Sequence, residues 1–212
     1  SFGGNLLDIE LIQERLKKRI PRPMEKMAEF AVLIPLINNK GKWELIYELR
    51  AMNMKSQPGE VSFPGGRLEN GETFQEAAIR ETIEELNIEE ININILGELD
   101  YLVSYANLEI HCFLATISGV DVDKIYPNPA EVDHLFTIPL DFFLNNEPKA
   151  YSLEMETKYN EEFPYNLIPK GKDYNFRKSK RTIYFYIYND YIIWGYTATM
   201  TKHLLELLRT YE

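Results

Sequence analysis

The chain has 212 residues, of which 45% are hydrophobic and 26% are charged. This composition can bury a substantial core, so it excludes intrinsic disorder and favours one globular domain. The formal net charge of −10 argues against a general nucleic-acid binder, because phosphate backbones are held by Lys and Arg side chains. A single cysteine, Cys112, excludes an intramolecular disulfide and a thiolate zinc cage.

The longest apolar stretches are far shorter than the roughly 20 residues that a membrane-spanning helix needs. We therefore expect a soluble, cytoplasmic protein that binds neither a membrane nor a nucleic acid. No internal repeat and no linker of distinct composition divides the chain. Residues 1–212 are accordingly predicted to form one domain.

The N-terminal part of the chain is predicted to form a helix and then a β-hairpin. Apolar residues recur at a spacing of three or four, which predicts a helix over about residues 5–20. Two strands, Phe30–Ile37 and Trp43–Arg50, flank the turn-forming run Asn38–Gly41. Pro35 cannot donate a backbone hydrogen bond, so it predicts an edge position or a bulge for the first strand.

A strand, a glycine-containing turn and a helix are predicted next. The short strand Glu60–Phe63 runs into Pro64–Gly66, where the backbone can come close to a ligand. Residues Thr73–Leu86 contain neither Gly nor Pro, which favours a helix. Asn87 can adopt the left-handed conformation that ends one.

The second half of the chain is predicted to mix strands and helices around a long excursion. The expected elements are strands at Ile91–Leu96, Ile110–Ile117 and Leu135–Ile138, a short helix at Leu140–Leu144, a hairpin formed by Thr182–Tyr188 and Tyr191–Trp194, and a final helix at Thr199–Leu208. Residues 146–180 are charged and predicted to be irregular. Tyr184, Tyr186 and Tyr188 alternate along one strand face, which is typical of a core or of the surface of a homodimer.

Glutamates are concentrated on the predicted helix Thr73–Leu86. Glu81, Glu84 and Glu85 fall on one of its faces within roughly 100° of arc. Like charges this close repel one another unless cations lie against them. Mg²⁺ prefers carboxylate oxygens and commonly bridges them to substrate phosphates. The cluster therefore indicates a metal-assisted reaction on a phosphate ester or anhydride, whereas a solvated acidic face is the alternative for the helix taken alone.

The run Gly66–Ile88 resembles the Nudix box. That box is a Gly, five residues, a Glu, seven residues, then Arg-Glu, an apolar residue, any residue, Glu-Glu, any residue, a Gly and an apolar residue. The residues that match are Gly66, Glu72, Arg80, Glu81, Glu84, Glu85 and Ile88. Thr82 replaces an aliphatic residue and Asn87 replaces the Gly, which is a mild change because Asn tolerates the left-handed conformation. The chain is thus identified as a member of the Nudix hydrolase family.

A second motif lies directly upstream and resembles the one that marks the coenzyme A pyrophosphatase branch of that family. The residues that agree with it are Arg50, Ala51, Gly59 and Phe63–Gly66. Three positions depart from it: Tyr47 breaks an aliphatic pair, Glu48 replaces a Thr and Lys55 replaces a second Arg. These changes bear on the substrate more than on the fold.

The resemblance implies an α/β fold in which a mixed β-sheet is sandwiched between helices, an α/β/α arrangement. It implies hydrolysis of a diphosphate bond, with coenzyme A as the leading substrate and 3',5'-ADP and 4'-phosphopantetheine as the products. The alternative substrate is ADP-ribose or a nucleotide sugar. A sensor that binds a nucleotide without cleaving it is the non-enzymatic alternative, and the intact glutamate set argues against it.

The resemblance also implies roles for individual residues. Glu81, Glu84 and Glu85, with the Gly66 carbonyl, would hold Mg²⁺ or Mn²⁺. The proton acceptor for the attacking water would be Glu81 or Glu131, a residue of a predicted loop.

Basic residues complete the predicted site. Arg80 is expected to orient the neighbouring carboxylates, because it offsets their repulsion. Arg50, Lys55 and Arg67 are candidate contacts for substrate phosphates, although each alone is equally compatible with a solvated surface charge. The histidines share no ligand spacing and are expected to be structural; they are His111, His134 and His203.

Overall fold

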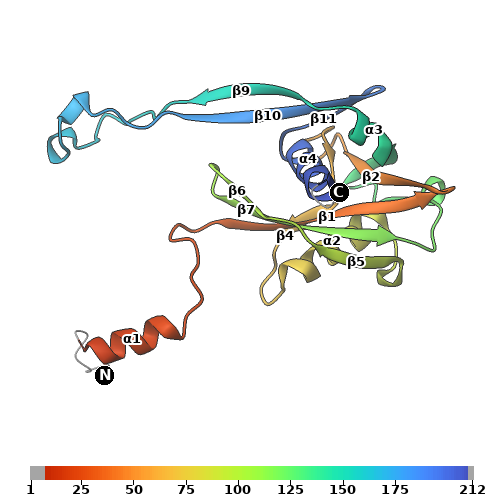
Figure 1. The fold of residues 1–212 in the computed structure, drawn as a ribbon, viewed down its shortest axis with the longest axis horizontal. Coiled ribbons are helices and arrows are strands. Elements are labelled where there is room, and N and C mark those ends of the chain that lie inside the picture. Colours follow the sequence, from red (N-terminus) through yellow and green to blue (C-terminus); the bar gives the residue numbers. More distant parts are fainter. Residues whose placement is uncertain (1–7, 210–212) are drawn as a thin grey trace.

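The computed structural model describes residues 8–209. The predicted N-terminal helix is confirmed as α1, Ile9–Lys17, with Asp8 as its cap, whereas the first residues of the predicted range lie outside the described part. None of the α1 residues is buried, and Figure 1 shows the helix standing apart from the rest of the fold.

The other elements form one large sheet, one small sheet and the helices that cover them. The large sheet contains β1 (Ala28–Asn39), β2 (Lys42–Arg50), β3 (Val61–Ser62), β4 (Gly65–Arg67), β5 (Ile93–Glu98), β6 (Leu102–Ser104), β7 (Leu108–Ile117) and β8 (Val132–Pro139). The small sheet contains β9 (Lys149–Met155), β10 (Ser179–Tyr188) and β11 (Tyr191–Trp194). The helices are α2 (Phe74–Leu86), α3 (Leu140–Asn145) and α4 (Gly195–Arg209).

The large sheet is mixed and has helices on both faces, which confirms the predicted α/β/α arrangement. β1 pairs in parallel with β7 and antiparallel with β2, so the predicted hairpin is also confirmed. Leu33 of β1 packs in one cluster with Ala77 of α2. The next residue, Ile34, packs in another cluster with Leu204 of α4, because successive side chains of a strand point to opposite faces. Figure 1 shows the two helices on the two sides of this sheet.

The prediction that Pro35 marks a sheet edge or a bulge is wrong, because β1 lies in the centre of the sheet. β7 pairs along one side of β1, while β4 pairs on the other side at Phe30–Val32 and β2 at Leu36–Asn39. The Leu33 N–H donates to the Pro64 carbonyl on this second side. The backbone nitrogen of Pro35, two residues later, points to the same side of β1, in the interval between the residues that pair with β4 and those that pair with β2. The N–H that proline lacks therefore removes no hydrogen bond between strands.

Helix α2 has the predicted ends. Thr73 caps its first turn in a capping box with Glu76, and Asn87 ends it in the left-handed conformation at φ 53°. Thr82 is buried and its hydroxyl donates to the Ala78 carbonyl, so this departure from the family pattern is satisfied within the helix. Helix α4 begins four residues earlier than predicted, at Gly195.

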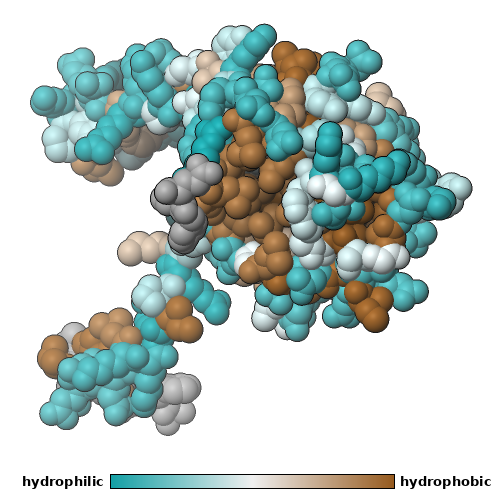
Figure 2. Space-filling view, turned by 45° about the vertical axis from the view of Figure 1, so that its right-hand side comes forward, coloured by the Kyte–Doolittle hydropathy of each residue, from teal (hydrophilic) through white to brown (hydrophobic). Residues whose placement is uncertain are grey.

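The prediction of an irregular segment at residues 146–180 is wrong in part. β9 and β10 pair antiparallel from Lys149↔Phe185 to Met155↔Ser179. This ribbon carries residues 156–178 away from the domain body, and we call residues 149–182 the arm (Figure 1). On the face shown in Figure 2, apolar side chains gather in a hollow of the body, whereas the arm is mainly hydrophilic. β9 was missed because six of its seven residues are exposed, so no buried face marks it in the sequence.

The alternating tyrosines of β10 belong to the core. Tyr186 is buried, and Tyr184 and Tyr188 pack against the same cluster. The homodimer therefore stays a prediction without support from these residues. Within residues 8–209, no helix has the length and apolar character needed to cross a membrane; the cytoplasmic location also stays a prediction.

Candidate active site

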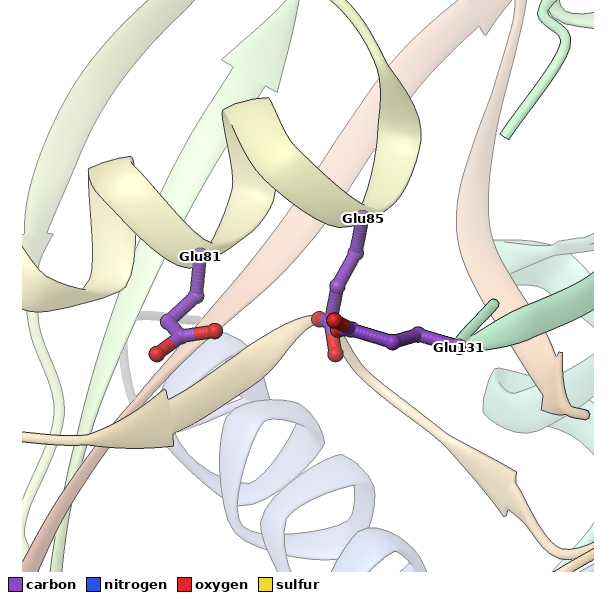
Figure 3. A group of neighbouring side chains, drawn as sticks. All are labelled: Glu81, Glu85 and Glu131. Carbon is purple, nitrogen blue, oxygen red and sulfur yellow. The ribbon is translucent and has the colours of Figure 1, made fainter. Parts of the chain in front are cut away.

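Three carboxylates from two parts of the chain converge beside the C-terminal half of α2. Glu81 and Glu85 project from adjacent turns of the helix, and Glu131 reaches toward them from the residue before β8 (Figure 3). Each of the three offers an oxygen within 4.8 Å of the others. We call Glu81, Glu85 and Glu131 the carboxylate triad. Glu85 is only 2% exposed, so the triad reaches from solvent into the protein interior.

Hydrogen bonds to backbone carbonyls fix the position of the loop that carries Glu131. The Asn128 N–H donates to the Glu85 carbonyl at 2.9 Å, and the Asn87 side chain donates to the Tyr126 carbonyl at 3.2 Å. On the other side, the Ala51 N–H donates to the Glu131 carbonyl at 2.8 Å. The loop is thereby attached to the end of α2 and to the segment after β2. Glu131 therefore lies beside the helix glutamates.

The two glycines of the turn allow the backbone to contact these carboxylates. The Gly65 N–H donates to Glu85 Oε2 at 2.9 Å. A Cβ atom at Gly66 would lie 2.2 Å from the Glu81 carboxylate, and one at Gly65 would lie 2.5 Å from the Ala31 carbonyl oxygen. Such distances are far below a normal contact. Gly65 is therefore required by the neighbouring backbone, whereas a side chain at position 66 would displace the Glu81 carboxylate.

Arg80 orients the acidic groups at the outer side of the triad. Its guanidinium binds both oxygens of Glu72, with Nε–Oε1 at 2.7 Å and Nη2–Oε2 at 3.1 Å. Nη1 donates to Glu81 Oε1 at 2.8 Å, and Nη2 also donates to the Arg67 carbonyl at 3.2 Å. Hydrogen bonding to Arg80 lowers the pKa of Glu72. This geometry is the one expected of a positioning residue.

Other predicted residues lie outside the triad. The Glu84 side chain is 53% exposed and lies 3.7 Å from Arg80 Nη1. Lys55 and Arg67 are exposed. Arg67 contacts the site through its backbone carbonyl, which accepts the hydrogen bond from Arg80. Arg50, at the end of β2, is partly buried, and its Nη2 donates to the Ser56 carbonyl at 3.4 Å.

The predicted structural histidines each have carboxylate neighbours of their own. Nδ1 of His111 lies 2.6 Å from Glu98 Oε1, and Nδ1 of His134 lies 2.6 Å from Asp133 Oδ2. Nε2 of His203 lies 2.9 Å from Asp100 Oδ2. None of the three belongs to the carboxylate triad.

Sequence reasoning missed Glu48, which is the most deeply buried carboxylate of the region. Its side chain is 1% exposed, and Glu48 Oε1 accepts a hydrogen bond from Ser62 Oγ at 2.8 Å. In the sequence Glu48 counts only as a replacement for a motif Thr. The signal that was available is an acidic residue within the otherwise apolar run Leu45–Leu49, where a buried charge needs a reason.

The acidic groups perturb one another because they are buried together. Burial, and then the charge of Glu48, raises the pKa of Glu85 to about 9. Burial also raises the pKa of Glu48 to about 7, with the charges of Glu131 and Glu81 adding to the rise. The pKa of Glu81 is raised by burial as well. Clustered carboxylate oxygens are a fitting donor set for a hard divalent cation, because its charge offsets the repulsion that raises their pKa values.

Comparison with known proteins shows which family the chain belongs to. The NUDIX domain model matches residues 27–156, which is more than half of the chain. Nudix hydrolase 3 of Caenorhabditis elegans is 28% identical over 90% of this chain and 77% of its own length. The mitochondrial coenzyme A diphosphatase NUDT8 of Mus musculus is 27% identical over 97% of this chain and 90% of its own. An Ap4A hydrolase structure from C. elegans has a TM-score of 0.45 and 24% identity, covering 53% of this chain and 80% of that one.

The chain belongs to the Nudix family. Family membership, the Nudix hydrolase relatives and the intact glutamates make it a pyrophosphohydrolase.

The raised pKa values predict how the cation-free protein responds to pH. In the unfolded chain Glu85 ionises near its ordinary pKa of 4.5, whereas the folded protein holds its proton until about pH 9. The unfolded state thus binds fewer protons between these values, and the free energy of unfolding should fall as pH rises, by up to about 1.4 kcal/mol per pH unit for one proton. Denaturant titrations in chelator between pH 5 and pH 9 measure this slope.

The matched variants are Glu85→Gln, which cannot ionise, and the exposed Glu90→Gln. Glu85→Gln should flatten the fall in stability, while Glu90→Gln should leave it unchanged. A wild-type protein that gains stability from pH 5 to pH 9 would contradict the buried-carboxylate description.

Proposed function

We propose that the chain hydrolyses the diphosphate bond of coenzyme A or its derivatives, in a reaction that depends on Mg²⁺ or Mn²⁺. The products would be 3',5'-ADP and 4'-phosphopantetheine. The observation that carries the proposal is the contact between the two sequence motifs. The segment that resembles the coenzyme A branch ends at Gly65 and Gly66, and these two residues contact Glu85 and Glu81 of the Nudix box. Relatives named as coenzyme A diphosphatases support the choice of substrate.

The triad would hold the divalent cations. Glu81, Glu85 and Glu131 supply carboxylate oxygens within 4.8 Å of one another, and the Gly66 carbonyl is a further candidate ligand. Bound cations would neutralise the diphosphate and lower the pKa of the attacking water. Glu84 would be an outer ligand of the cations, because its side chain lies on the exposed side of the helix. Arg80 holds Glu81 in place through its hydrogen bond to Oε1.

Three basic residues that precede the triad in the sequence would bind the substrate phosphates. Arg50 is the strongest candidate, because its buried Nε has no hydrogen-bond partner among the described residues. Lys55 and Arg67 present exposed charges to a nucleotide on the surface. An Arg–phosphate pair can form two parallel hydrogen bonds, which would orient the diphosphate.

Hydrolysis needs an acceptor for the proton of the attacking water. Glu81 and Glu131 are the two candidates, because both are partly exposed members of the triad. A carboxylate that serves as general base must be ionised, so activity should fall on the acidic side of its pKa.

ADP-ribose or a nucleotide sugar is the second candidate substrate. It is favoured by two of the three departures from the coenzyme A motif, Glu48 and Lys55. Lys55 keeps a positive charge but lacks the planar fork of Arg, so it would bind a phosphate less specifically.

Glutamine variants of the triad test the metal-dependent chemistry. Glu81→Gln and Glu85→Gln should each lower turnover by a factor on the order of 100, because each removes charge that stabilises the transition state through the cation. Glu84→Gln should have a smaller effect, and the exposed Glu90→Gln is the matched control. Initial rates with Mg²⁺ and then Mn²⁺, and in chelator, measure these differences.

Full activity in chelator, or wild-type rates for both Glu81→Gln and Glu85→Gln, would refute the proposal. The pH-rate profile of Glu131→Gln separates the two candidate bases. Loss of the acidic limb together with a fall of about 100-fold would assign the role to Glu131, and an unchanged profile would assign it to Glu81.

A substrate panel with an arginine variant tests the nucleotide. Arg50→Ala should lower kcat/KM for coenzyme A by roughly 10- to 150-fold, the cost of a charge-assisted hydrogen bond. If Arg50 contacts the 3'-phosphate, the variant should lose its preference over dephospho-coenzyme A. Lys42→Ala, an exposed cation at the other end of β2, is the control. Chromatography identifies the products from coenzyme A, dephospho-coenzyme A, ADP-ribose and a nucleotide sugar, and faster cleavage of ADP-ribose would favour the second candidate.

A further inference from the structure

Glu48 is a buried acid on the same side of the large sheet as α2. Its neighbour Tyr47 belongs to the core cluster on the α4 side, and the Tyr47 hydroxyl hydrogen-bonds to Thr201 Oγ1 of α4 at 2.9 Å. Because side chains alternate along a strand, Glu48 points to the opposite face, where α2 carries Glu81 and Glu85. The Glu48 side chain is 1% exposed there.

Only one of the two oxygens of the Glu48 carboxylate has a hydrogen-bond partner among the described residues. Ser62 Oγ donates to Oε1, but Oε2 is buried and has no hydrogen-bond partner among residues 8–209. The nearest cation is Arg50, whose Nη1 lies 4.0 Å from Oε1, beyond hydrogen-bonding distance. A buried acceptor left without a partner costs about 1–3 kcal/mol, and more when it is charged.

Arg50 offsets the Glu48 charge only in part, because three further carboxylates lie near Glu48. Glu131 and Glu81 repel the Glu48 carboxylate, and Glu48 in turn repels the carboxylate of Glu85. Arg80 does not relieve Glu48, because its guanidinium is engaged by Glu72 and Glu81. A divalent cation is the partner that matches several carboxylates at once, since Mg²⁺ and Mn²⁺ bind through oxygen atoms.

We propose that Glu48 supplies an additional oxygen ligand for the divalent cations of this site, from β2 rather than from the Nudix box. The inference rests on the proposed metal dependence. The triad oxygens lie within 4.8 Å of one another without Glu48. We therefore assign Glu48 to a second cation, beside the one that the triad would hold. The usual motif residue is a neutral Thr, and Glu48 therefore adds one negative charge to hold that second cation.

Mn²⁺ binding to the purified protein, measured by calorimetry and by the electron paramagnetic resonance signal of free Mn²⁺, tests this inference without any substrate. The variants are Glu48→Gln, which keeps an acceptor for Ser62, and Glu48→Thr, which places the usual motif residue. The control is Glu44→Gln, a buried acid at 9% exposure on the same face of β2, bonded to the Asn39 side chain at 3.2 Å. Thermal unfolding in chelator establishes that each variant is folded.

Wild type and Glu44→Gln should bind more than one Mn²⁺ per chain. Glu48→Gln and Glu48→Thr should lose one ion, or bind the weaker ion at least about tenfold less tightly, which corresponds to one lost ligand contact of about 1.4 kcal/mol. Both should unfold in chelator at or above the wild-type temperature, because a buried charge has been removed.

The possible failures are distinguishable. Wild-type protein that binds no Mn²⁺ would overturn the proposed metal dependence and this inference with it. Wild-type protein that binds Mn²⁺ with the same number and affinity as both Glu48 variants would overturn this inference alone.

Discussion

Burial of several carboxylates at one place is the constraint on which the site depends. Glu48, Glu81, Glu85 and Glu131 come from a strand, a helix and a loop, and burial raises the pKa of the first three. Such a group is unfavourable in a folded protein unless a cation or a proton compensates it. The arrangement thus suits a divalent cation, which the proposed diphosphate substrate would also need.

The fold positions the three triad carboxylates beside the glycine turn and the end of α2. Gly65 binds Glu85, Gly66 leaves room for Glu81, and the loop that carries Glu131 is tied to the end of α2. The central strand β1 supports this arrangement, because it pairs with β4 just where the glycine turn contacts the helix. The geometry of the triad therefore depends on the packing of α2 against the sheet and on the hydrogen bonds that attach the Glu131 loop to α2.

The elements that rest on local signals could be predicted from the sequence. Thr73 and Asn87 delimit α2 by their own capping chemistry, and helical spacing alone places Glu81 and Glu85 on one face. The position of Pro35 depends on which strands flank β1, and local sequence does not carry that information. Glu48 was missed for a related reason: its burial beside the triad arises from the pairing of β2 with β3 and β8, whereas the motif marks it only as a departure.

The most direct test of the account is the location of the cations themselves. Crystals grown with Mn²⁺ give an anomalous difference map that identifies each ion independently of activity. The account predicts one peak among the carboxylates of Glu81, Glu85 and Glu131 and a second next to Glu48. Well-ordered Mn²⁺ bound elsewhere on the protein, with no peak at these carboxylates, would contradict it.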